Sequence, residues 1–204
     1  MPSAHPFLPY GRQEIDEDDI QAVVEVLRGS WLTTGPSVAA FEDRLAACCG
    51  ASDAVAVANG TAALHLAMLA AGIGPGDWVV VPSITFLASA NAARYVGADV
   101  VFADVDPDSG LMTPATCEAA IARAKGPVRA IVPVHLGGRL VDLASIRAIA
   151  DKTGALVIED ACHALGGTGP GPDGKPEPVG TCAQSDMAVF SFHPVKTVTS
   201  GEGG

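Results

Sequence analysis

The first patterned segment of the chain is amphipathic with a helical period. Between Ile20 and Leu27, apolar residues recur every three or four positions, and a run of acidic residues precedes them. Asp16 is placed to cap a helix N-terminus, and Gly29 follows the last apolar position. Because a capping acid and a terminal glycine are common helix boundaries, the pattern predicts a helix within residues 16–29.

A second helix is predicted over residues 38–50. Phe41, Leu45 and Cys48 fall on one face of that helix, and Gly50 provides a stop signal. Both helices precede the first strand-like segment of the chain.

From residue 53 onward, short apolar runs alternate with helical patterns. The apolar runs have the length and composition of strands, whereas the segments between them have helical spacing. The predicted strands are residues 53–59, 77–83, 99–105, 129–136, 155–160 and 186–192. The predicted helices between them are residues 60–72, 86–97, 113–124 and 143–154.

This alternation predicts the α/β class. Strands that are apolar throughout are buried on both faces, which is typical of a mostly parallel sheet covered by helices. The segment 166–181 is rich in glycine and proline. Because another strand follows it directly, we interpret it as an excursion within the domain. Residues 1–204 are therefore assigned to one domain.

Composition narrows the class of partner. Hydrophobic residues make up 49% of the 204-residue chain and charged residues 17%, and the formal net charge is −11. These values favour a folded core, and the negative charge disfavours nucleic acid and anionic membrane surfaces as partners. The apolar runs are short and broken by proline, so no membrane span is predicted, and the N-terminus lacks the pattern of a signal peptide.

The five cysteines indicate a reducing compartment, and we expect the cytoplasm. Their number is odd, Cys48 and Cys49 are adjacent, and no pair has the spacing C-x-x-C. We therefore expect no disulfide and no metal site.

Candidate chemistry follows the predicted strands directly. In a parallel sheet, ligands bind at the C-terminal ends of strands, where loops and helix N-termini meet. Gly60, Thr61 and Ala62 begin a helix after such a strand, so free N–H groups and a hydroxyl are available there for a phosphate. The alternative explanation is an ordinary helix capped by Asn59 or Thr61.

Two further strand ends carry ionisable side chains. Asp160 ends the strand at 155–160, with His163 just after it, and Lys196 follows the last strand. A carboxylate in a poorly hydrated crevice needs a cation, and a lysine in a cleft can form a Schiff base. Each could instead have a structural role, as a helix cap, a satisfied histidine or a surface lysine. Together with the phosphate site they match the three anchors of pyridoxal phosphate: its phosphate, its pyridinium nitrogen and its aldehyde.

The segments around these residues resemble one known family. Five of them, in order and over nearly the whole chain, are similar to the DegT/StrS sugar aminotransferases, which are fold-type-I pyridoxal phosphate enzymes. The five are NGTAALHLAM, PSITFLASANAARYVGADVVFADVDPDSG, AIVPVHLGG, VIEDACHALGG and VFSFHPVKTVTSGEGG. The segment FSFHPVK further resembles the branch that aminates C4 of UDP-linked 4-keto sugars in pseudaminic acid synthesis.

The resemblance implies catalytic and cofactor-binding roles. Lys196 matches the lysine that forms the Schiff base and shuttles protons, and Asp160 matches the carboxylate that keeps the pyridine nitrogen protonated. His163 matches the position near the 3'-oxygen of the cofactor, and Phe86 the aromatic residue that stacks on its ring. The positions that bind the phosphate are matched by Gly60, Thr61, Ala62 and Ser191.

The resemblance also implies a substrate and an assembly. Residues that match the lining of the sugar-nucleotide pocket are Tyr10, Ser30, Trp31, Leu32 and Thr33. The expected reaction is a ping-pong transamination of a UDP-4-keto-6-deoxy-N-acetylhexosamine, with glutamate as the amino donor, in amino-sugar synthesis for surface glycans. The full-length enzyme is expected to be a homodimer.

Three alternatives stay open. Some relatives aminate C3, some carry histidine in place of the lysine and dehydrate the sugar, and a relative could bind cofactor or sugar nucleotide without turnover. Lys196 argues against the dehydratases. Family members are roughly twice as long, so we expect this chain to be part of a longer protein, a three-layer large domain without its small C-terminal domain.

Overall fold

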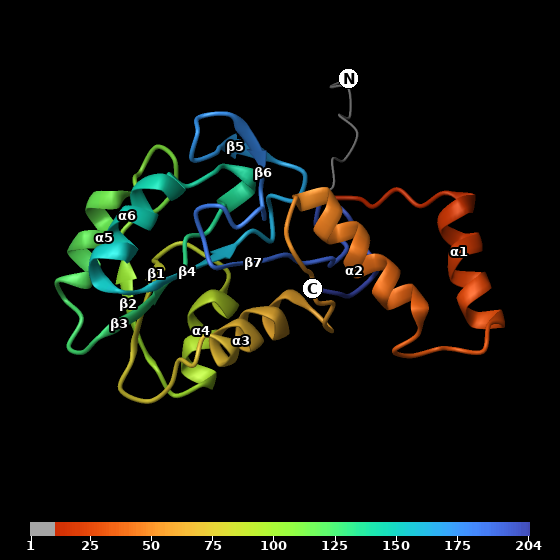
Figure 1. Cartoon of the computed structure of the whole chain (residues 1–204), viewed down its shortest axis with the longest axis horizontal. Coiled ribbons are helices and arrows are strands. Elements are labelled where there is room, and N and C mark those ends of the chain that lie inside the picture. Colours follow the sequence, from red (N-terminus) through yellow and green to blue (C-terminus); the bar gives the residue numbers. More distant parts are fainter. Residues whose placement is uncertain (1–10) are drawn as a thin grey trace, which may run out of the picture.

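Apolar strands and intervening helices build a central sheet in the computed structural model, which describes residues 11–204 (Figure 1). The strands are β1 (Trp78–Pro82), β2 (Asp99–Ala103), β3 (Val128–Ile131), β4 (Leu156–Asp160), β5 (Thr168–Pro170), β6 (Pro176–Pro178) and β7 (Met187–Val189). The helices are α1 (Glu17–Arg28), α2 (Pro36–Cys49), α3 (Gly60–Ala70), α4 (Leu87–Tyr95), α5 (Pro114–Ile121) and α6 (Leu143–Thr153), with a 3₁₀ turn at Leu136–Gly138.

The main sheet is parallel and is covered on both faces. Its order is β2-β1-β3-β4-β7, and each neighbouring pair of strands is parallel. Val79 and Val81 pack with α3 and α4, whereas Val80 packs with α5 and α6 on the opposite face. This alternation along one apolar strand confirms the predicted three-layer α/β arrangement.

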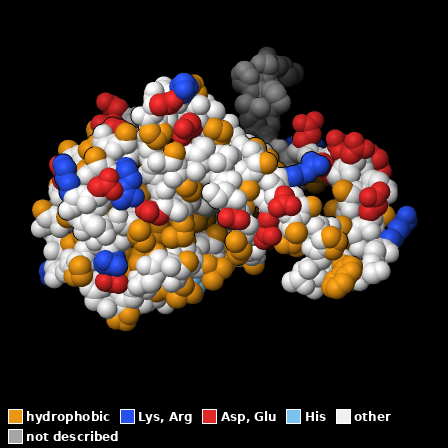
Figure 2. Space-filling view, viewed as in Figure 1, with side chains coloured by type: hydrophobic (Ala, Val, Ile, Leu, Met, Phe, Trp, Pro, Cys, Tyr) orange, Lys and Arg blue, Asp and Glu red, His pale blue; other side chains and the backbone are white. Residues whose placement is uncertain are grey.

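Helix α1 stands apart from the sheet. Asp16 caps it through its side chain, which accepts the N–H groups of Asp18 and Asp19, as the sequence predicts. Its apolar positions are largely exposed, and no residue of α1 is buried. Figures 1 and 2 show it projecting from the body, with acidic side chains gathered around its start.

The predicted strand at residues 53–59 is wrong. The segment is irregular, and its backbone pairing is a mutual exchange between Val57 and Gly204, with N···O distances of 2.8 and 3.0 Å. That exchange is an antiparallel pair, and one such pair does not make a ladder.

Two strands and one helix face also differ from prediction. Strand β3 ends at Ile131 because Pro133 has no N–H to donate, and β7 ends at Val189 because Phe192 turns to pair with Gly203. On α2, Cys49 is buried and Cys48 is exposed, since Cys49 is the cysteine that packs with Phe190 and Phe192 in the core beside Phe41 and Leu45. Burial raises the pKa of the Cys49 thiol to about 11, so it stays protonated.

The glycine- and proline-rich segment forms a small antiparallel hairpin of β5 and β6. Asp173 accepts the N–H of Lys175, and Gly174 has a φ of +79°, which a glycine adopts without strain. The hairpin lies between β4 and β7, which are neighbours in the main sheet, and the sequence analysis did not predict its strands.

Candidate active site

The loops after β1, β3, β4 and β7 surround one cavity together with the start of α3. Its volume is about 680 Å³, within the range of small-molecule sites. The predicted residues that line it are Gly60, Thr61, Phe86, Asp160, His163, Ser191 and Lys196. They meet because β1, β3, β4 and β7 are successive neighbours in a parallel sheet and so end at the same edge.

The N-terminus of α3 forms one wall of the cavity. Asn59 caps the helix, and its Oδ1 accepts the N–H of Ala62 at 2.8 Å. The amide of Ala62 is thus already engaged, and Ala62 is absent from the cavity lining, so Gly60 and Thr61 are the stronger candidates for an anion. A Cβ on Gly60 would lie 3.0 Å from Cβ of Ser191, which explains why glycine stands there.

Asp160 is held in a nearly dry position at the end of β4. The residue is 5% exposed, Oδ2 accepts the hydroxyl of Ser89 at 2.6 Å, and Oδ1 accepts the N–H of Cys162 at 3.3 Å. Within residues 11–204, no Lys, Arg or His side chain forms an ion pair with it. A buried carboxylate satisfied only by neutral donors fits a cationic ligand group at this position.

Lys196 and His163 are far apart in sequence, but both line the cavity. The backbone N–H of Lys196 donates to the carbonyl of His193 at 2.9 Å, and this bond fixes the loop that carries the lysine. Nδ1 of His163 accepts the N–H of Gly137 at 3.2 Å, so the ring proton lies on Nε2. Burial and the positive charge of Lys196 lower the pKa of His163, and the charge of Asp160 partly opposes them.

This lowered pKa predicts how stability depends on pH. A histidine whose pKa is lower in the folded protein binds its proton more weakly there than in the unfolded chain. The contribution of His163 to the free energy of unfolding is therefore fully present above its ordinary pKa of 6.5. It is lost as the pH falls through the lower pKa of the folded state. We expect the stability of wild type to fall relative to His163→Gln as the pH is lowered from neutral, measured by urea unfolding. A difference that grows in favour of wild type on acidification would contradict this.

Four of the five predicted sugar-nucleotide residues, Ser30 to Thr33, are not at the cavity. Ser30 to Thr33 connect α1 and α2, are exposed, and do not line it; the side chain of Trp31 is 65% exposed. Tyr10 lies outside the described residues. Phe86 does line the cavity, but it is 70% exposed, as an aromatic wall without a ligand against it would be. The substrate roles of these positions stay predictions.

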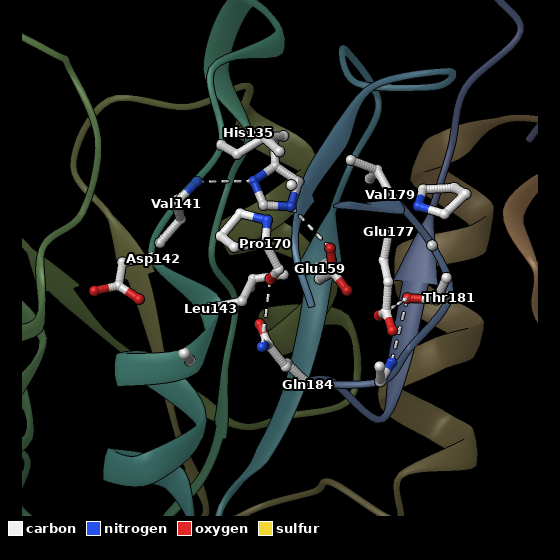
Figure 3. A pocket seen from close by; sticks show the side chains of 16 residues that line it. His135, Val141, Asp142, Leu143, Glu159, Pro170, Glu177, Val179, Thr181 and Gln184 are labelled. Atoms are coloured by element: carbon white, nitrogen blue, oxygen red, sulfur yellow. Dashed lines mark hydrogen bonds and ion pairs between the residues drawn. The ribbon is translucent and has the colours of Figure 1, made fainter. Parts of the chain in front are cut away.

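A second polar group lies buried on the other face of β4 (Figure 3). The ring of His135 accepts the N–H of Val141 at Nδ1, so its proton lies on Nε2, which donates to Oε2 of Glu159 at 2.8 Å. The Ser185 hydroxyl donates to the other oxygen of Glu159. The adjacent cavity of about 70 Å³ has room for water but not for a substrate. The backbone N–H of His135 also donates to the backbone carbonyl of Asp160, so this buried group helps to hold Asp160 in place.

Removing His135 should therefore destabilise the protein. His135→Ala leaves the N–H of Val141 and one oxygen of Glu159 without partners in a buried place, which costs about 2–4 kcal/mol of unfolding free energy. Urea denaturation measures the loss. His65→Ala is the matched control, because His65 is only partly buried and makes an edge contact with Tyr95. Equal losses in the two variants would contradict the role of the buried group.

Two classes of site are not found in the part of the chain described. Residues 11–204 contain no cluster of three or more His, Cys, Asp or Glu side chains suited to a metal ion. None of the helices over the same range has both the length and the hydropathy for a membrane crossing.

Comparison with known proteins places the chain in a family. The model of the DegT/DnrJ/EryC1/StrS aminotransferase family matches residues 13–204. The chain belongs to this family. The match includes all the residues of the cavity lining, so the DegT/StrS resemblance inferred from the five segments is confirmed.

Relatives within the DegT family support the same placement. A UDP-4-amino-4-deoxy-L-arabinose–oxoglutarate aminotransferase of Shewanella sediminis is 43% identical over 199 residues, which are 97% of this chain and 48% of that protein. The putative sugar aminotransferase Spr1654 of Streptococcus pneumoniae, in its PLP form, is 32% identical with a TM-score of 0.88 over 97% of this chain and 52% of its own. An aminotransferase of Psychrobacter cryohalolentis is 36% identical with a TM-score of 0.83, over 98% and 48% of the two chains.

These DegT relatives refine two predictions. The chain spans about half the length of the relatives it matches. The curated relative is named for a UDP-linked 4-amino-arabinose, not for a pseudaminic acid precursor. The family is thus as predicted, whereas the expected branch is not the one that this relative represents.

Proposed function

We propose that the cavity binds pyridoxal phosphate and that the protein transfers an amino group to a nucleotide-linked 4-keto sugar. The observation that carries the proposal is the meeting of Lys196, Asp160 and the N-terminus of α3 around one cavity. Solved relatives with this fold include PLP and PMP forms of a sugar aminotransferase. These three groups match in kind the three anchors that pyridoxal phosphate needs, for its aldehyde, its ring nitrogen and its phosphate.

The residues present fit the cofactor. When bound, pyridoxal phosphate supplies an aldehyde that takes up an amino group and a protonated ring that withdraws electrons. Asp160 would hold the ring nitrogen, Gly60, Thr61 and Ser191 the phosphate, and Phe86 one face of the ring. His163, with its proton on Nε2, would donate to the ring's hydroxyl oxygen. The volume of about 680 Å³ leaves room for a substrate beside the cofactor.

Lys196 has two tasks in this proposal. Its amine would hold the cofactor through the aldehyde group, and as a free amine it would carry a proton between the reacting carbon atoms. The carboxylate of Asp160 is anchored by two protein donors, the hydroxyl of Ser89 and the N–H of Cys162. Asp160 itself is only 5% exposed, so little of its surface is in contact with water.

The substrate is proposed from the curated relative. Its name pairs a UDP-linked 4-amino sugar with oxoglutarate, and the reverse pairing has glutamate as the amino donor to a UDP-linked 4-keto sugar. A homodimer is part of the proposal; the exposed apolar positions of α1 are a surface that a second subunit would cover. Size-exclusion chromatography with light scattering tests that assembly.

The function is tested in two steps with purified full-length protein. Incubation with pyridoxal phosphate should produce a visible absorbance band that borohydride bleaches, and absence of the band would refute cofactor binding. UDP-, dTDP- and GDP-linked 4-keto sugars are then offered with glutamate, and products are identified by mass. An amino sugar from a UDP-linked substrate is expected. If the absorbance band appears but no amino sugar forms, the protein binds the cofactor without transferring an amino group, and the proposed transaminase activity is refuted.

A further inference from the structure

A buried serine connects two residues of the cavity lining, Asp160 at the end of β4 and Thr85 in the loop after β1. Ser89 lies in the first turn of α4, is fully buried, and places its Oγ 2.6 Å from Oδ2 of Asp160. The same Oγ is 2.7 Å from Oγ1 of Thr85, which lines the cavity next to Phe86. We propose that Ser89 is a positioning residue for the transamination, which orients Asp160 and joins it to the loop that carries Phe86. This inference rests on the proposed function.

The proton directions in this chain of hydroxyls follow from chemistry. An ionised carboxylate can only accept, so the one proton of Ser89 is donated to Asp160. The carbonyl of Phe86, 3.2 Å from the same Oγ, then receives no proton from it. Thr85 must be the donor in its contact with Ser89, since Oγ of Ser89 has only lone pairs left. The relay therefore runs from Thr85 to Ser89 to Asp160, and each bond polarises the next.

The relay fixes an oxygen that the backbone does not reach. The backbone N–H of Cys162 holds Oδ1 at 3.3 Å, and Ser89 alone holds Oδ2 among the hydrogen bonds of the described residues. Without Ser89 the carboxylate is free to rotate about its Cβ–Cγ bond, and a buried oxygen loses its partner. Ser89 itself has no exposed surface, so the bond is made away from bulk water.

Helix capping does not explain the contact. Ser89 is the third residue of α4, whose N-cap Phe86 has no side-chain capping bond. The third residue of α6, Ser145, shows the ordinary arrangement: its hydroxyl donates to Oδ2 of its own N-cap, Asp142, at 2.6 Å. Ser89 donates instead to a carboxylate 71 positions along the chain. The two serines thus form the same bond, one in the buried interior beside Asp160 and one on the surface.

The test compares Ser89→Ala with Ser145→Ala in the full-length protein. Each variant removes a serine hydroxyl from an aspartate at the same distance. For Ser89→Ala we expect kcat to fall about tenfold with little change in the KM for glutamate, and the dissociation constant for pyridoxal phosphate to rise about tenfold. Ser145→Ala should leave both at wild-type values. Ser89→Thr keeps the hydroxyl and should recover most of kcat.

Further measurements separate the possible failures. A purely structural serine would lower the urea midpoint of Ser89→Ala without changing kcat, and that result would overturn the inference. If Ser89→Ala does not fold, Thr85→Val removes only the far end of the relay and should lower kcat about two- to fivefold by weaker polarisation. Wild-type kcat in Thr85→Val would then overturn the inference. Lack of cofactor binding by wild type would instead refute the proposed function.

Discussion

Lys196→Ala should lose at least about a thousandfold in transamination rate, because it removes both the covalent attachment of the cofactor and the group that moves the proton. Lys196 is half-buried, lies in the cavity lining, and forms no ion pair with a described residue. Its amine is therefore not committed to a structural contact. The fold should tolerate the change, so the loss should appear in activity and not in the urea midpoint.

The attachment can be measured apart from activity. After incubation with pyridoxal phosphate and reduction with borohydride, the wild-type peptide containing Lys196 should carry the mass of the cofactor, and the variant should carry none. Lys175→Ala is the matched control, because Lys175 is exposed at the hairpin and pairs with Asp173. A cofactor mass on any other lysine in wild type would contradict the assignment.

The sheet and most of the cavity were predictable because both depend on local patterns. Continuous apolar runs mark buried parallel strands, and a parallel sheet brings its strand ends to one edge. Asp160 and Lys196 follow two of those strands, so their approach follows from the strand rhythm together with the family resemblance. The apolar period of α1 and its acidic cap also predicted that helix correctly.

The errors arise where a partner far along the chain decides the structure. Residues 53–59 have a strand-like composition, yet a strand needs a ladder, and only the pair with Gly204 is formed. Cys48 and Cys49 both suit a helix, and only packing against the core selects Cys49. Ser89 was overlooked because it lies inside a helix, not at a strand end. Only the structure shows that it reaches Asp160.

Asp160→Asn tests the other end of the cofactor site. An amide is nearly isosteric with the carboxylate: its oxygen can still accept the N–H of Cys162, while its NH2 group takes the place of Oδ2 and donates to Oγ of Ser89, whose proton then turns to the carbonyl of Phe86. The amide carries no charge, however, and so does not keep a ring nitrogen protonated. We expect turnover to fall about a hundredfold to a thousandfold with the fold preserved, because a preorganised charge in a water-excluded site is lost. Steady-state rates and urea unfolding measure the two effects separately.

The choice of asparagine over alanine follows from the contacts of Asp160. Alanine would leave the Ser89 hydroxyl and the N–H of Cys162 unpaired in a buried place, so a loss of activity could then reflect a loss of stability. Asp142→Asn is the matched control, since Asp142 accepts a serine hydroxyl at the same 2.6 Å on the surface of α6. If Asp160→Asn turned over at the rate of Asp142→Asn, the ring nitrogen would not depend on Asp160. The buried carboxylate would then be structural, joined through Ser89 to α4 and through its backbone to His135.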